Sequence, residues 1–311
     1  MVSTIAHPAD SAPTTAKLCA LATPCALATT TLRDRATAAL RALAAALICA
    51  FVAAPAMSKE EPLLEVGLGI GAIAFEDYRG SSTTHAYPLP IGYLLYNGDF
   101  LKADRDGVRG LLFNQSWVTL NLSGNLTTPV KNDRERSGMP DLRSTVEAGP
   151  SLDFHLLKSA DGKVKFDLRL PVRAAFTVQA VPKYIGWTFN PRLALDLKDP
   201  AGFTGWNVGL MTGPLFADRR YHDYFYSVAE EYATDSRPAY QASAGYAGFQ
   251  TLGAISKRFP KFWVGAYARY DTLDGAVFAD SPLVQKNSYW SAGFGISWII
   301  HTSTRMVEVP D

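Results

Sequence analysis

The sequence predicts an exported, all-β protein: an antiparallel, up-and-down transmembrane β-barrel of about twelve strands, with ten to fourteen allowed. Three observations support this prediction. Strand-like alternation recurs along most of the chain, tryptophans bracket the apolar face of one strand, and a short apolar segment lies near the start. Together they indicate a chain that leaves the cytoplasm and then faces lipid with its strands.

Residues 289–300 give the plainest lipid-facing strand. One set of alternate residues is small or polar, namely Tyr289, Ser291, Gly293, Gly295 and Ser297. The other set is apolar and bracketed by tryptophans, namely Trp290, Ala292, Phe294, Ile296 and Trp298. In a water-soluble sheet the apolar face would pack on a core, whereas glycines and serines have no bulk to cover anything. Nine residues at roughly 3.3 Å each separate the tryptophans by about 25 Å, the spacing of aromatic girdles in membrane barrels.

Residues 1–56 are predicted to be a targeting segment that ends in a signal peptide. Arg33, Arg35 and Arg41 precede an uncharged run over residues 42–54, and Ala54-Pro55-Ala56 supplies a cleavage site. The run is shorter than the ~20 apolar residues that a membrane-spanning helix needs. Cleavage after Ala56 leaves residues 57–311 as one barrel domain with a tail from about residue 301. For the length before the signal we favour an over-extended translation start over a folded domain.

Composition narrows the class further. The three cysteines, Cys19, Cys25 and Cys49, all precede the cleavage site, so the processed chain has neither a disulfide framework nor a Cys-ligated metal. A net charge of +1 argues against nucleic acid, which favours a strongly basic domain. No apolar run after residue 57 reaches the length of a membrane helix. An exported chain of this kind is therefore a soluble periplasmic β protein or an outer-membrane barrel.

Period-2 alternation, which favours the barrel, recurs from Leu64 onward and is longest over residues 163–179. Such a strand exceeds the mean of about five or six residues in soluble sheets but suits a tilted membrane crossing. In chain order we expect strands near residues 64–75, 87–96, 99–104, 108–113, 116–126, 142–157, 163–178, 186–198, 203–216, 240–256, 262–271 and 288–299.

The connections between these strands alternate in length. Short ones, rich in the turn formers Gly, Pro, Asn and Asp, lie at residues 97–98, 114–115, 159–162, 199–202 and around Pro260. Long ones lie at residues 76–86, 126–141, 180–185, 217–239 and 272–287. Short periplasmic turns and long extracellular loops alternate in this way in outer-membrane barrels, which places both termini in the periplasm. The turn Arg105-Asp106-Gly107 is an exception, because the strand count puts it outside although it is short.

The long connection over residues 217–239 is crowded with aromatic side chains. The aromatic and histidine residues in and around it are Tyr221, His222, Tyr224, Phe225, Tyr226, Tyr232 and Tyr240. A folded-back plug, a partner-binding surface and the upper aromatic belt each explain this density, and the pattern does not choose among them.

Charged residues on the non-apolar strand faces are predicted to point into the lumen. The candidate lumen-facing charges are Glu147, Asp153, Lys165, Asp167, Arg169, Arg173, Arg192, Asp196 and Arg269. Their mixed signs favour internal ion-pair ladders, with a charge-selective pore as the functional alternative. Twelve strands lie between the filled eight-stranded barrels and the open sixteen-stranded ones, so a narrow or occluded lumen is expected.

The same strand faces raise the question of catalysis. His155 shares a face with Glu147, Ser151 and Asp153, but residues two apart on a strand project side by side, whereas a triad needs direct nucleophile–base contact. A polar lumen face is the preferred interpretation, and no other histidine has a better set of neighbours. No His pair has ligand spacing, and Gly67-x-Gly69-x-Gly71 lies within a strand without a βαβ unit. We therefore assign no catalytic, cofactor-binding or metal-binding residue.

Several segments, taken in order, resemble the MipA/OmpV family. They are Pro88-Leu89-Pro90-Ile91-Gly92-Tyr93, residues 98–110, Gly138-Met139-Pro140-Asp141-Leu142, Glu147-Ala148-Gly149-Pro150, Leu170-Pro171-Val172-Arg173-Ala174, residues 221–228, Arg237-Pro238-Ala239-Tyr240 and Asp280-Ser281-Pro282-Leu283-Val284. The resemblance extends from about Leu64 to Trp298. The chain departs from a typical barrel at its end, because residues 301–311 follow the strand that contains Trp298.

The resemblance implies an outer-membrane β-barrel of the MltA-interacting type. One member is described as a scaffold that joins a lytic transglycosylase to a bifunctional penicillin-binding protein, which makes murein. Other members are described as porin-like proteins or adhesive antigens, and the family brings no shared catalytic residues. Three hypotheses follow for this chain: a non-enzymatic scaffold for peptidoglycan enzymes, a narrow channel for small solutes, and an enzyme that acts on lipid or peptide at the outer face. A role as a surface adhesin, through the aromatic loop, stays open beside them. Membrane lipid is the expected environment, with no cofactor and no nucleic acid.

Overall fold

A computed structural model describes residues 59–98, 101–104 and 107–309 of the chain. The chain divides into residues 1–49 and 50–311, and only the second unit contains described residues. In chain order the strands of its large sheet are β2 (Leu64–Glu76), β3 (Thr84–Asn97), β4 (Leu101–Asp104), β5 (Gly107–Asn114), β6 (Val118–Leu126), β7 (Thr145–Lys158), β8 (Val164–Thr177), β9 (Tyr184–Phe189), β10 (Arg192–Lys198), β11 (Trp206–Ala217), β12 (Gly245–Arg258), β13 (Phe262–Thr272) and β14 (Ser288–Thr302).

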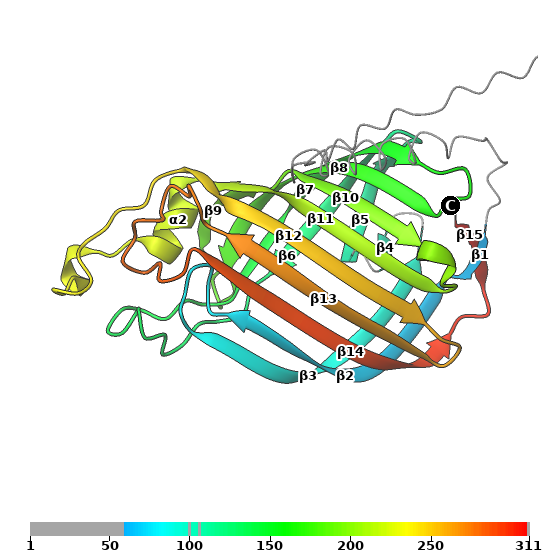
Figure 1. Cartoon of the computed structure of the whole chain (residues 1–311), viewed down its shortest axis with the longest axis horizontal. Coiled ribbons are helices and arrows are strands. Elements are labelled where there is room, and N and C mark those ends of the chain that lie inside the picture. The colour runs from blue at the N-terminus through cyan, green and yellow to red at the C-terminus, as the bar shows by residue number, and fades with distance from the viewer. Residues whose placement is uncertain (1–58, 99–100, 105–106, 310–311) are drawn as a thin grey trace, which may run out of the picture. The chain divides into compact units, whose positions relative to one another are not determined.

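These strands close into an antiparallel barrel (Figure 1). Except for β9 and β10, each strand pairs with its neighbour in sequence, and β14 returns to pair with β2 from Ala292 to Thr302. β9 and β10 lie one after the other in the same gap, where β8 and β11 pair with both. The thirteen strands therefore fill twelve positions in the wall, and the predicted fold class is confirmed.

The expected strand ranges agree with the structure, with two informative differences. The predicted strand over residues 186–198 is interrupted between β9 and β10 at Asn190 and Pro191, where proline has no N–H to donate to a ladder. The strand expected from residue 240 begins at Gly245, because Tyr240 instead forms an isolated bridge with Val228. Local backbone chemistry, rather than the hydrophobic pattern, sets both boundaries.

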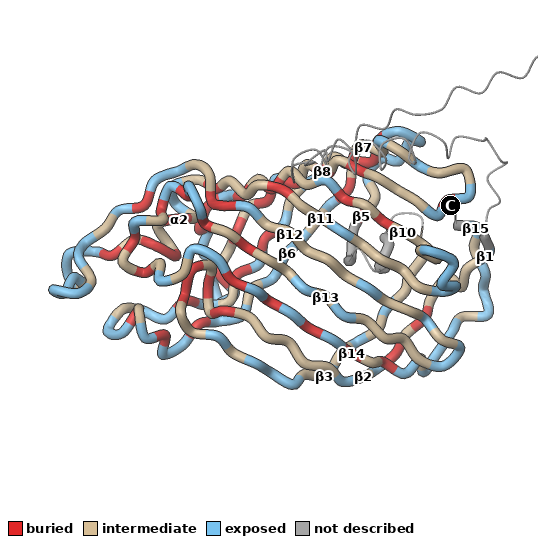
Figure 2. Tube along the Cα trace, in the orientation of Figure 1, coloured by how far each residue is buried: buried red, intermediate tan, exposed pale blue. Residues whose placement is uncertain are grey.

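Burial along the wall is inverted relative to a soluble protein. On β14, Trp290 is 66% exposed and Phe294 is 65% exposed, whereas Ser291 and Ser297 are at most 1% exposed. Figure 2 shows this alternation of buried and exposed residues along the strands. The exposed apolar band is what a bilayer would cover, and the buried polar residues face the inside of the barrel.

The two ends of the barrel differ. At one end lie the long connections and α2 (Arg219–Tyr226), and at the other lie the short turns (Figure 1). The short-turn end also carries a second, two-stranded sheet in which β1 (Lys59–Pro62) pairs with β15 (Met306–Val309). The expected tail from residue 301 is thus partly structured, because β14 continues to Thr302 and β15 follows.

Two short 3-10 turns, Pro200–Gly202 and Glu230–Tyr232, complete the described elements. No helix among the described residues combines the length and the apolar character needed to cross a membrane. The predicted signal segment, its cleavage after Ala56 and the three cysteines lie outside the described residues, as do Arg105 and Asp106 of the exceptional turn.

Candidate functional site

The inner face of β6, β7, β8 and β10 forms a charged wall. Arg169 donates from Nη2 to Asp196 at 3.2 Å and, more weakly, to Asp167 at 3.5 Å. All three residues are less than a tenth exposed. The register places Arg169 opposite Arg192 on β10, and Lys165 opposite Asp196. The long Arg169 side chain therefore reaches along the neighbouring strand to Asp196. The charged groups therefore brace neighbouring strands from within.

Asp153 on β7 extends this wall toward β6. Its carboxylate accepts hydrogen bonds from Asn121 at 2.8 Å and from Ser151 at 2.5 Å. Hydrogen bonds to a charged group are stronger than neutral ones, so a buried carboxylate held in this way stabilises the register of the two strands.

The other predicted lumen charges lie farther along the barrel toward the long loops or across it. Glu147 accepts from Tyr221 at 3.0 Å, and Arg173 donates from Nε to Ser123 at 3.0 Å. Arg269 on β13 donates from Nε to Asp271 at 2.7 Å. Arg192 is partly buried and has an Nε without a hydrogen-bond partner among the described residues.

A cavity of about 1410 Å³ opens inside the short-turn half of the barrel. Five of the nine predicted charges line it, namely Asp153, Lys165, Asp167, Arg169 and Asp196. Residues of β1 and β15 also line it, among them Glu60, Glu61 and Met306. The cavity thus reaches the end of the barrel that carries the second sheet.

His155 lies in this cavity within a row of three polar groups. Its Nδ1 lies 2.9 Å from Asp167 Oδ1, and its Nε2 lies 2.9 Å from Thr119 Oγ1. The neighbours are therefore cross-strand residues rather than Ser151, which bonds Asp153 instead. The spacing is that of a base-assisted hydroxyl, yet Thr119 is buried and also bonds Asn114 at 2.8 Å. Among the described residues, no group of three or more acidic, His or Cys side chains is arranged to hold a metal ion.

At the opposite end, four connections fold together into what we call the loop cap, residues 77–83, 127–144, 218–244 and 273–287. Tyr226 and Phe278 stack at 3.7 Å between ring centroids, and His222 packs edge-on against Phe278 at 4.8 Å. All three side chains are almost fully buried. The aromatic residues at 221–226 therefore form α2 and part of a packed core, which supports the plug interpretation of this segment.

Arg79 fastens the loop cap to the wall. Its side chain donates to Asp271 on β13 at 3.1 Å, to Tyr289 on β14 at 3.2 Å and to the Ala247 carbonyl on β12 at 2.6 Å. Its own carbonyl accepts from the Tyr226 hydroxyl at 3.0 Å. One residue from the β2–β3 connection thus joins three wall strands to α2.

Burial shifts the acidities of groups in the cap. The desolvated carboxyl of Asp133, beside Glu135 and Asp77, has its pKa raised to about 6. Burial lowers the pKa of His222, whose Nδ1 lies 2.6 Å from the Ser243 carbonyl and whose Nε2 has no partner among the described residues. His222 is therefore a neutral packing residue at physiological pH.

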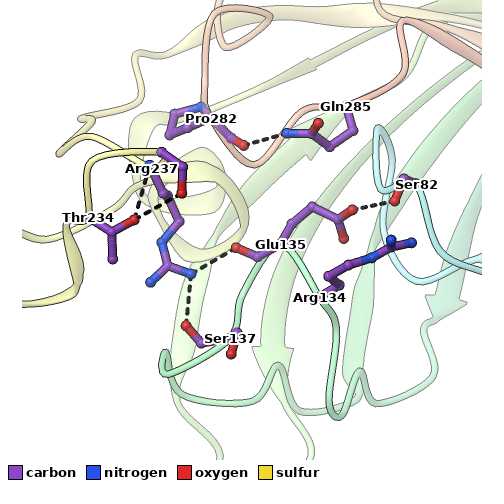
Figure 3. A pocket seen from close by; sticks show the side chains of 9 residues that line it. Ser82, Arg134, Glu135, Ser137, Thr234, Arg237, Pro282 and Gln285 are labelled. Atoms are coloured by element: carbon purple, nitrogen blue, oxygen red, sulfur yellow. Dashed lines mark hydrogen bonds between the residues drawn. The ribbon is translucent and has the colours of Figure 1, made fainter.

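A polar pocket of about 530 Å³ lies on the loop cap among Ser82, Arg134, Glu135, Arg237 and Gln285 (Figure 3). Arg237 donates from Nη1 to the carbonyls of Glu135 and Ser137, each at 2.9 Å, and Ser82 donates to the Glu135 carboxylate. The guanidinium is thus used to hold loops 127–144 and 218–244 together, and the pocket is mainly a junction between loops.

Sequence reasoning missed two of the residues that organise these regions. Arg79 was only one position in a long connection, and Thr119 was overlooked because its partners are on other strands. The alternation of β6 against β7 and β8 could have found Thr119, since register brings Asp153 opposite both Thr119 and Arg169. No pattern in the sequence indicated Arg79.

Comparison with known proteins places the chain in a family. The family model described as MltA-interacting protein MipA matches residues 68–300, from the first strand of the wall to the last. A relative, "Outer membrane protein OmpV" of Vibrio cholerae serotype O1, is 24% identical over 215 residues, which is 65% of this chain and 75% of that protein.

A solved structure was also matched, that of the outer membrane protein OprG from Pseudomonas aeruginosa. It covers 78% of this chain and 95% of that chain, but with 7% identity and a TM-score of 0.20, too low to support any conclusion. The family match and the inverted burial of the wall do not depend on it. The chain is a β-barrel of the outer membrane and belongs to the MltA-interacting protein MipA family.

Proposed function

We propose that this protein is a non-enzymatic scaffold of the outer membrane whose periplasmic end gathers enzymes that synthesise and cleave murein. The name of its family, MltA-interacting protein, is the direct support for a lytic transglycosylase as one partner. A bifunctional penicillin-binding protein is the second partner in the proposal. Fold alone does not give function, so the proposal needs a surface on this chain that can bind proteins.

The β1–β15 sheet is the observation that supports such a surface. Among the described residues, β1 and β15 pair as strands only with each other; Asn97 donates to the Pro62 carbonyl of β1 at 3.0 Å, whereas β15 keeps one open backbone edge. An extended segment of a partner can add to such an edge through main-chain hydrogen bonds. The sheet lies at the short-turn end, which faces the periplasm in barrels of this class.

Capture from detergent-solubilised membranes tests the scaffold. The wild-type barrel should recover a lytic transglycosylase and a bifunctional penicillin-binding protein. Val307→Pro, which breaks β15 opposite Glu61, should lower recovery about tenfold, and Ser236→Pro in the loop cap should leave it unchanged. Recovery from the wild type no better than from an unrelated barrel counts against the scaffold.

The second candidate is a narrow channel, favoured by the charged cavity of about 1410 Å³. Planar-bilayer recordings test it. If the protein is a channel, the wild type should give a conductance above that of detergent alone. If it conducts, Arg169→Glu with Arg173→Glu should shift selectivity toward cations. The loop cap argues against free passage, because it packs apolar residues across the other end.

An enzymatic role for the Thr119–His155–Asp167 row is not part of the proposal. The row is explained as a brace between β6, β7 and β8, since Thr119 is buried and shares its hydroxyl with Asn114. Covalent labelling with a fluorophosphonate probe checks this. We expect no labelling, and labelling that disappears in both Thr119→Ala and His155→Ala would reverse the assignment.

A further inference from the structure

One stretch of the barrel wall is paired on one side only. β3 pairs with β2 along its length, from Thr84 to Tyr96, but it pairs with β4 only at Tyr96 and Asn97. Among the described residues, 84–95 have no strand partner on the β4 side. Within this stretch Pro88 and Pro90 lack the N–H that a second ladder would need, and proline in strands is confined to edges, first positions and bulges.

The unpaired edge lies at the depth of the bilayer. Through β2, Gly92 is in register with Trp298, and Ala86 is in register with Ala292. The edge therefore crosses the apolar band of the outer surface. A bare backbone edge in hydrocarbon is costly unless it lines a cavity or meets a partner.

The cavity inside the barrel reaches this edge. Five successive residues of β3, from 91 to 95, line it, including Ile91, Gly92 and Leu94. Ile91, Tyr93 and Leu95 are on the inner face of the strand, whereas Gly92 and Leu94 are on its outer face, where Leu94 is 46% exposed, and the cavity is lined by residues of both sets. The cavity therefore passes around the edge of β3, and we call this place the side opening.

The inner wall next to the side opening carries apolar side chains, bordered by Glu65, which accepts from the Tyr93 hydroxyl and from Arg258. The rings of Tyr93 and Trp263 lie 6.0 Å apart, and Ile91 lies over Gly71 and Gly295, where an added Cβ would come within 2.2 Å of its Cδ1. The glycines of β2 and β14 thus make room for apolar side chains from β3 and β13. Across the cavity lies the charged wall with Asp153, Asp167 and Arg169.

We propose that the side opening admits a single-chain amphiphile from the bilayer into the cavity. Its chain lies along Ile91, Tyr93 and Trp263, and its ionised head group faces the charged wall. The cavity offers an apolar surface and a charged surface within one volume. The side opening faces the bilayer, where such a molecule resides. Ligand pockets combine an apolar lining with polar groups that fix orientation, and this cavity has charged residues in larger number than a purely apolar ligand would need. This binding role is separate from the proposed scaffold, whose partners would meet the β1–β15 sheet.

Quenching of Trp263 fluorescence by dibromostearate in phosphatidylcholine vesicles tests the proposal, because bromine quenches only on contact. The fluorescence of the wild type minus that of Trp263→Phe gives the signal of this one tryptophan. We expect its signal to fall saturably as dibromostearate is added. The lipid-facing Trp290 and Trp298, which are 66% and 51% exposed, report partition of the probe into the membrane.

Two matched glycine variants locate the entrance. An added Cβ at Gly92 or at Gly253 meets no atom within 4 Å, and both residues are on the outer face of the wall, but of the two only Gly92 lines the cavity. In Gly92→Phe, the Trp263 signal is again obtained by subtracting the fluorescence of the same protein with Trp263→Phe. Half-maximal quenching of that signal should need at least about fivefold more dibromostearate than in the wild type. Gly253→Phe should behave as the wild type.

Heat-modifiable mobility on gels shows that each variant is folded before it is scored. An unquenched Trp263 in the wild type, while the lipid-facing tryptophans are quenched, would overturn the proposal. Equal quenching in Gly92→Phe and Gly253→Phe would also overturn it, because the probe would then enter by another route. Neither result bears on partner capture by the β1–β15 sheet.

Discussion

The two ends of the barrel are built by different physical means. The loop cap at the long-loop end buries aromatic and aliphatic side chains against one another, as the core of a soluble domain does, around Tyr226 and Phe278. The short-turn end keeps a cavity of about 1410 Å³, in which charged side chains bond one another across strands. The difference indicates that the long-loop end is closed by packing, whereas the short-turn end is left accessible.

Arg79→Ala should have the largest effect on this difference between the two ends, because Arg79 holds the loop cap to the wall. The change removes three side-chain contacts to β12, β13 and β14 and leaves the buried Asp271 with fewer partners, so we expect a loss of about 3 kcal/mol in unfolding free energy. Planar-bilayer conductance should then rise above that of the wild type, because the cap is no longer held to the wall.

Arg219→Ala is the control for that experiment, because Arg219 is exposed and pairs only loosely, at 3.6 Å, with Asp223 of the same helix. It should change neither unfolding nor conductance. If Arg79→Ala and Arg219→Ala gave the same small effects, Arg79 would not be what fastens the loop cap.

Phe278→Ala should loosen the loop cap without disturbing the wall. Phe278 is fully buried, so its truncation should cost about 3 kcal/mol of local stability. Hydrogen exchange should speed up in residues 218–244 and 273–287 while β12, β13 and β14 keep their protection. The adjacent, partly exposed Val277→Ala is the matched control, and loss of protection that spread into the strands would show that the two regions are not separable.

Asp167→Asn should have a smaller effect at the other end. The change weakens the contacts to His155 and Arg169, and hydrogen bonds to a charged partner contribute about 1–3 kcal/mol each. Urea unfolding of the folded barrel measures this. No change in the midpoint would mean that the charged wall does not stabilise the barrel, and the ion-pair interpretation of these residues would fail.

Acidification should weaken the loop cap slightly through His222. Its folded-state pKa is lowered by burial, so its contribution is complete above its ordinary value of 6.5 and is lost as the pH falls below that value. Proteolysis of loop 218–244 should therefore be faster at pH 5 than at pH 7.5 in the wild type. His222→Phe should reduce this difference between the proteolysis rates at the two pH values. The titration of Asp133 contributes equally in both proteins and therefore cancels when they are compared.

The wall could be predicted from the sequence, but the ends could not. Alternation over residues 163–179 and 289–300 fixed strands because each residue's face follows from its position alone. The packing of Tyr226 on Phe278 joins residues 52 positions apart, and nothing in a single sequence pairs them. Arg79 is a lone charge in a loop for the same reason.

The site residues divide in the same way. The nine predicted lumen charges came from strand alternation, and the structure places five of them on the cavity. Whether they select ions stays a prediction. Thr119 escaped notice because its partners come from β5 and β7, although strand register would have indicated it. Pro88 and Pro90 were visible in the sequence as strand residues without an N–H, and their physical meaning, an unpaired edge, appeared only with the pairing of β3.

Accessibility of two serines, each replaced by cysteine and compared with the unchanged protein, tests the central claim most directly. Ser256 lines the inner cavity and Ser236 lines the pocket on the loop cap. A membrane-impermeant maleimide added to intact cells should label Ser236→Cys but not Ser256→Cys, which should react only after the outer membrane is permeabilised. Equal labelling of both positions from outside would contradict a barrel closed at its outer end.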